Sequence, residues 1–122
     1  MRFDNLRVFT CAALLVAPGL GQADDAAEQM VQDALPVMYH TCASVVEEAD
    51  GDETYIHAVV EKMTALSIYN RQINIEEHAT SDEDKAALRE TFLSALAEGC
   101  AEDKDALLGG VVDNAVKTTL GL

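Results

Sequence analysis

The sequence contains three cysteines, and two of them, Cys42 and Cys100, remain once the first 23 residues are set aside as an export signal. Exported proteins fold outside the reducing cytosol, where a pair of cysteines readily forms a disulfide. Two cysteines allow one intramolecular pairing. We therefore expect a small domain that is closed by a Cys42–Cys100 disulfide.

Two free thiols and a pair of metal ligands are the alternatives to this disulfide. Neither cysteine lies in a C-x-x-C motif, and no histidine lies near either one at the spacing of a zinc site. We therefore predict no metal site at the cysteines.

The first 23 residues have the parts of a secretory signal peptide in the usual order. Arg2 and Arg7 make the start positively charged, an apolar run covers residues 8–17, and Gly21 and Ala23 supply small residues at a cleavage site. The run is about half as long as the ~20 residues that cross a membrane. We expect cleavage after Ala23, one helical domain over residues 24–122, and a periplasmic protein without a membrane span. The alternative to a signal peptide is that the first 23 residues form an ordinary N-terminal helix of a cytosolic protein.

The expected mature chain is strongly acidic. Removal of Arg2, Arg7 and Asp4 leaves six basic and 21 acidic side chains, a net charge of −15 with neutral histidines. Nucleic acids and anionic lipids bind basic surfaces, so neither is an expected partner. Solubility or adaptation to a salty medium is a sufficient explanation for such a charge, and a response to pH is the functional alternative. Below about pH 4 the carboxylates become neutral and the net charge reaches roughly +9, which favours loosening of a small core.

Nearly every segment after residue 24 has helical periodicity, and β-branched alternation is absent. We predict an all-α, single-domain bundle of four to five short amphipathic helices. The expected ranges are 25–49 with the start of a new helix or a kink at Pro36, 53–71 with Asp52 as N-cap, 80–99 with a Thr80–Glu83 capping box and an end at Gly99, and 102–119.

No pattern for catalysis or cofactor binding emerges. Asp50, Asp52, Thr54 and Glu61 match positions of a calcium loop, but Tyr55 stands where that loop requires glycine. The three histidines share no short spacing, the serines lie in no nucleophile elbow, and no glycine-rich phosphate loop is present. We predict a protein that is not an enzyme and binds no cofactor or metal.

The last two expected helices carry a wide apolar face for so small a domain. Core packing is the ordinary role of such residues. A homodimer interface and a client-binding surface are the functional interpretations. The residues of this face are Leu88, Phe92, Leu96, Leu107, Val111 and Val112.

Several segments together resemble the HdeA family of periplasmic acid-stress chaperones. They are Thr41-Cys42, the helix over Val59 to Asn70, and Cys100-Ala101-Glu102-Asp103-Lys104 followed by an amphipathic helix. The resemblance runs from Thr41 to Leu120. It implies a small helical protein that is folded at neutral pH, can be dimeric, and loosens in acid. Its apolar helix faces would then bind unfolded periplasmic proteins without ATP.

A second function class fits the acidic surface equally well. A small periplasmic interaction module, such as an inhibitor or immunity-type protein, would dock one basic protein partner at neutral pH. A helical protein without chaperone activity is a third interpretation.

Overall fold

The computed structural model describes residues 25–122, so the expected signal peptide lies outside the described residues. Residues 25–34 are helical, and the 3-10 helix η1 (Leu35–Val37) follows them. Next come α2 (Cys42–Ala49), α3 (Glu53–Asn70), the 3-10 helix η2 (Ile75–Glu77), α4 (Asp82–Glu102) and α5 (Leu108–Leu120). This order confirms the predicted all-α fold. None of these helices is long and apolar enough to cross a membrane.

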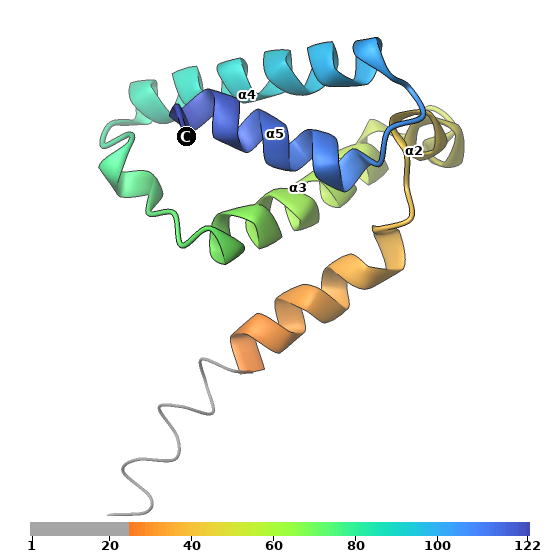
Figure 1. Cartoon of the computed structure of the whole chain (residues 1–122), viewed down its shortest axis with the longest axis horizontal. Helices are drawn as coiled ribbons and strands as arrows, with labels where there is room; N and C mark the ends of the chain where they lie inside the picture. Colours follow the sequence, from red (N-terminus) through yellow and green to blue (C-terminus); the bar gives the residue numbers. More distant parts are fainter. Residues whose placement is uncertain (1–24) are drawn as a thin grey trace, which may run out of the picture.

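Helix α5 lies between α3 and α4 (Figure 1). It packs against both of them, whereas α3 and α4 make few contacts with each other. Helix α2 packs on α3, and the helix at residues 25–34 extends away from the bundle (Figure 1). The bundle is therefore organised around α5.

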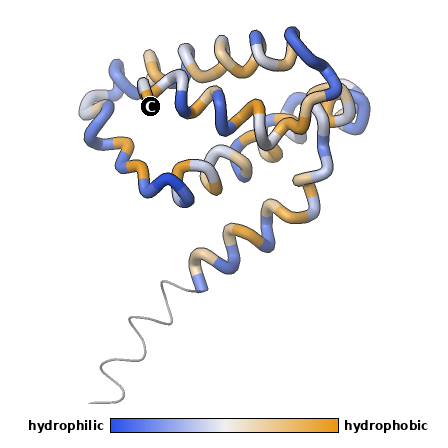
Figure 2. Tube along the Cα trace, in the orientation of Figure 1, coloured by the Kyte–Doolittle hydropathy of each residue, from blue (hydrophilic) through white to orange (hydrophobic). Residues whose placement is uncertain are grey.

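The buried face of α5 explains this central position. Leu108, Val112, Ala115 and Val116 are buried and follow the helical repeat. They meet buried residues of α2 and α3, including Val45, whereas α4 has no fully buried residue. Apolar positions recur along every helix of the bundle rather than in one segment (Figure 2). The core thus forms mainly where α2, α3 and α5 meet.

The Cys42–Cys100 disulfide is confirmed. It joins the first residue of α2 to the last turn of α4, with the two Cα atoms 5.6 Å apart. The bond links α4 to the main core at one end of the bundle.

Two predicted helix boundaries are also confirmed. Asp52 caps α3, and its carboxylate accepts a hydrogen bond of 3.0 Å from the Thr54 N–H. The chain leaves the α conformation at Pro36, where η1 forms. The second helix of the expected 25–49 segment starts only after Thr41, which forms a capping box with Ser44.

The predicted boundaries of α4 are wrong at both ends. Ser81 caps the helix in place of Thr80, and its hydroxyl accepts a bond of 3.1 Å from the Asp84 N–H. The helix also continues through Gly99. This glycine allows a close approach, because a Cβ atom there would lie 2.7 Å from Cγ1 of Val111 on α5.

The last helix starts at Leu108 rather than at residue 102, because residues 103–107 bond to the start of α2. The Cys42 N–H donates to the Ala106 carbonyl (3.1 Å), and the Ala43 N–H donates to the Lys104 carbonyl (2.8 Å). The first N–H groups of a helix have no partner within the helix. Here the turn at residues 103–107 supplies the carbonyl acceptors for the first N–H groups of α2. The turn therefore belongs neither to α4 nor to α5.

A bidentate ion pair joins the end of α3 to α5. Arg71 Nε and Nη2 lie 2.8 and 2.7 Å from the two carboxylate oxygens of Asp113, and the Ser67 hydroxyl donates to the same carboxylate at 2.7 Å. The bonds from Arg71 and then Ser67 lower the pKa of Asp113 to about 2. The carboxylate therefore stays ionised in moderate acid.

Replacing both bonded cysteines by serine should lower the free energy of unfolding by about 4 kcal/mol, because the bond closes a 58-residue loop. Urea unfolding of the oxidised protein and of the double variant measures this difference. Reductant should destabilise the wild type and leave the variant unchanged. Equal unfolding midpoints and slopes would contradict a stabilising disulfide.

Replacing Asp113 by asparagine should cost about 1 kcal/mol at neutral pH, after solvent screening of the half-exposed pair is allowed for. A lowered pKa gives stability that is present above about pH 4 and lost as the pH falls through about 2. The difference from wild type should therefore vanish near pH 2 in urea unfolding. Glu90→Gln, at an exposed position on α4, is the control. A difference that does not change with pH would contradict the role of the ionised carboxylate.

Candidate binding groove

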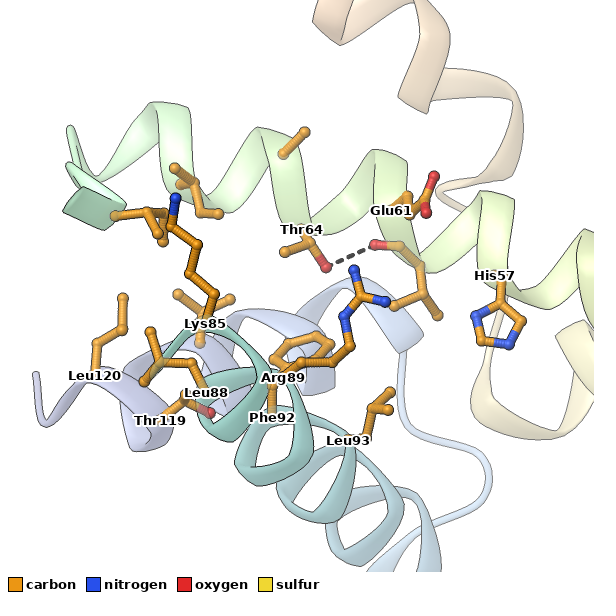
Figure 3. A pocket seen from close by; sticks show the side chains of 15 residues that line it. His57, Glu61, Thr64, Lys85, Leu88, Arg89, Phe92, Leu93, Thr119 and Leu120 are labelled. Carbon is orange, nitrogen blue, oxygen red and sulfur yellow. Dashed lines mark hydrogen bonds between the residues drawn. The ribbon is translucent and has the colours of Figure 1, made fainter. Parts of the chain in front are cut away.

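An apolar groove of about 420 Å³ lies between α3 and α4, above α5 (Figure 3). It exists because both helices pack on α5 and only slightly on each other. Side chains of α3 and α4 form the two walls, and the end of α5 forms the floor. The apolar lining residues include Val60, Ala65 and Ile68 on α3, Leu88, Phe92 and Leu93 on α4, and Val116 and Leu120 on α5.

The α4 wall leaves much of this apolar surface in contact with solvent. Leu93 is 44 % exposed, and Leu88 and Phe92 are only half-buried. Exposure of apolar area costs about 25 cal/mol per Å², so soluble proteins rarely keep such faces without a use. A concave apolar surface of this kind indicates a binding site.

Two basic side chains, Lys85 and Arg89, are among the six polar residues that line the groove. Lys85 and Arg89 lie one turn apart on α4, and His57 and Glu61 lie on α3 (Figure 3). The Lys85 ammonium bonds to Glu76 at 2.9 Å, whereas Arg89 forms no ion pair within the described residues. Arg89 extends from α4 toward Thr64 on the opposite wall (Figure 3). Two of the six lysine and arginine residues within the described range 25–122 thus gather at this groove.

The structure separates the six residues of the predicted apolar face. Leu88 and Phe92 line the groove, whereas Leu96 and Val111 pack against the core. Val112 is fully buried. Leu107 is 60 % exposed at the start of α5 and is not among the groove residues. A single surface made of all six does not exist.

Sequence reasoning missed Leu93 and the whole α3 wall. The apolar repeat of α3 supplies both the buried Val59 and the groove residue Val60, so the repeat alone does not separate core residues from groove residues. The apolar pair Phe92-Leu93 was the available signal, because two adjacent apolar residues on a helix widen its apolar arc.

A second cluster surrounds His40, whose side chain is fully buried. Its Nδ1 lies 2.9 Å from the Ser44 hydroxyl, and its Nε2 lies 2.8 Å from the Tyr55 hydroxyl and 2.9 Å from the Glu48 carboxylate. Tyr39 also donates to that carboxylate. Both ring nitrogens therefore have partners, and the cluster fastens the start of α2 to α3.

Within residues 25–122, no three side chains of the metal-binding types come together. Comparisons with protein-family models, curated proteins and solved structures gave no match.

Replacing Glu48 by glutamine should lower the pKa of Tyr39 from about 12 toward its ordinary value near 10. The hydrogen bond to the Glu48 carboxylate is the main cause of the raised pKa, because it favours the protonated phenol. The NMR signal of the Tyr39 ring during an alkaline titration measures this. Glu47→Gln is the control and should leave the value near 12. An unchanged Tyr39 titration in Glu48→Gln would contradict the bonded arrangement.

Proposed function

We propose that this chain is an exported, ATP-independent acid-stress chaperone, whose groove holds apolar segments of unfolded periplasmic proteins at low pH. The single observation that carries the proposal is the open apolar groove between α3 and α4. Its lining is aliphatic and aromatic and presents few polar groups at fixed positions. Such a surface accepts varied apolar side chains with little sequence preference, as a chaperone requires.

The way in which α3 and α4 are held on α5 suggests how acid would change the groove. The pair between Arg71 and Asp113 holds α3 on α5 until the pH approaches about 2. Helix α4 has no fully buried residue to hold it in the same way. As the acidic chain becomes positively charged, we expect α4 to loosen from α5 first, which moves α4 away from α3 and widens the groove.

The disulfide would keep α4 attached to the rest of the bundle in acid. Cys100 lies in the last turn of α4, and Cys42 is buried at the start of α2. A loosened α4 would therefore remain attached at this end. Both walls of the groove would stay near each other while their apolar side chains become more accessible.

The resemblance to the HdeA family supports the choice of activity. It rests on an expected export signal, two cysteines and helical periodicity, and the helices and the disulfide are features that the structure shares. Periplasmic location, acid dependence and client binding are proposals for this chain.

The exposed acidic surface favours a second candidate, a neutral-pH interaction module for one basic protein. The first turn of α4 alone carries Asp82, Glu83 and Asp84, all exposed and with no ion pair among the described residues. Tight binding of one basic periplasmic protein that weakens with salt would favour this candidate.

The chaperone proposal predicts that the protein keeps acid-denatured proteins soluble near pH 3. The fraction of an aggregation-prone mixture that stays in the supernatant after pelleting measures this. Leu93→Lys should weaken the affinity for apolar segments by about tenfold or more, since it places an ammonium group, charged at any pH, on the apolar wall.

Val46→Lys is the matched control, because Val46 is an exposed apolar residue on α2 outside the groove, 59 % exposed against 44 % for Leu93. It should protect as well as wild type. No protection by the wild type near pH 3 would refute the chaperone proposal. Equal protection by Leu93→Lys would exclude the groove as the client site.

A further inference from the structure

Two apolar residues at the end of the helix at residues 25–34 are exposed to solvent. Val31 is 42 % exposed and Leu35, one turn later in η1, is 61 % exposed. Met38 follows at 36 % exposure, but it packs near Gly109 of α5, where an added Cβ would lie 3.2 Å from the Met38 Cε. The helix projects from the bundle into solvent (Figure 1). The chain therefore carries two unpartnered apolar surfaces, a protruding helix and the α3–α4 groove.

These two surfaces match in length. A helix of ten residues is about 15 Å long at 1.5 Å per residue. The α3 wall of the groove runs from His57 to Ile68, which is about 17 Å on the same scale. Docking of an amphipathic helix by its i, i+4 and i+7 side chains is a common way to fill such a groove.

The two surfaces also have opposite charge. The helix carries Asp25, Glu28 and Asp33 and no basic residue. Glu28 lies one turn before Val31. The α4 wall of the groove carries Lys85 and Arg89, and Arg89 has no ion-pair partner among the described residues. An incoming acidic helix supplies that partner.

We propose that the helix at residues 25–34 of one copy docks in the α3–α4 groove of a second copy, and that the second copy returns the same contact. The groove of the same chain is not the target, because the buried Ala34 and Val37 fix the end of the helix where it points away from the bundle. A reciprocal exchange has two-fold symmetry and forms a closed dimer.

The proposed dimer contact and the proposed binding of clients use the same groove, so the dimer contact rests in part on the proposed function. One variant distinguishes the two. Leu35→Lys changes the helix and leaves the groove intact. It should raise the dimer Kd at neutral pH by about tenfold or more, because it removes an apolar anchor. It should still protect clients in acid. Leu93→Lys, which changes the groove, should lose both properties.

Sedimentation equilibrium over a concentration series measures the dimer Kd of the exported protein made from the full chain. Val46→Lys is the control and should dimerise as wild type does. Glu28→Arg and Arg89→Glu should each raise the Kd by about threefold to tenfold, and the double variant should recover much of the loss. Circular dichroism verifies that each variant is folded.

Mixing the two lysine variants tests the reciprocal geometry. Leu35→Lys keeps a working groove, and Leu93→Lys keeps a working helix. Each alone should be monomeric, while their mixture should form a heterodimer through one helix–groove contact.

Three results would overturn the inference. They are a wild type that is monomeric at every concentration, a dimer that tolerates Leu35→Lys, and a dimer that forms in Leu93→Lys alone. The last result would show that the helices pair with each other instead of entering the grooves.

Discussion

The packing of the apolar face of α5 against α2, α3 and α4 determines the form of this molecule. Helices α3 and α4 each bury side chains on α5, and Gly99 lets α4 come close enough to contact Val111. Since both helices use α5 as their partner, neither closes on the other. The groove between them is a direct consequence of this arrangement, and so is the half-exposed apolar wall of α4.

Much of the fold could be predicted from the sequence, because local chemistry decides it. Asp52 caps α3 through its own carboxylate, and Pro36 ends the first helix through its ring. The errors occur where tertiary contacts decide. Gly99 is a packing position rather than a helix end, and the start of α5 shifts because residues 103–107 bond to the first N–H groups of α2.

The candidate site could be predicted only in part, for a related reason. A helical repeat of apolar residues shows that a face is buried or available, and it does not show which helix covers it. Phe92 and Val112 belong to the same kind of stripe, yet one lines an open groove and the other lies in the core. The cationic edge at Arg89 depends on how α4 is placed, which the sequence pattern does not contain.

The central claim is that the groove between α3 and α4 is the surface that binds apolar segments. Methyl-labelled protein mixed near pH 3 with a spin-labelled, unfolded apolar polypeptide tests this directly. The signals of groove residues such as Ile68, Leu88 and Leu93 should broaden, while those of Val46 on α2 should not. Equal broadening at all of these positions, or none in the groove, would show that the groove is not the binding surface.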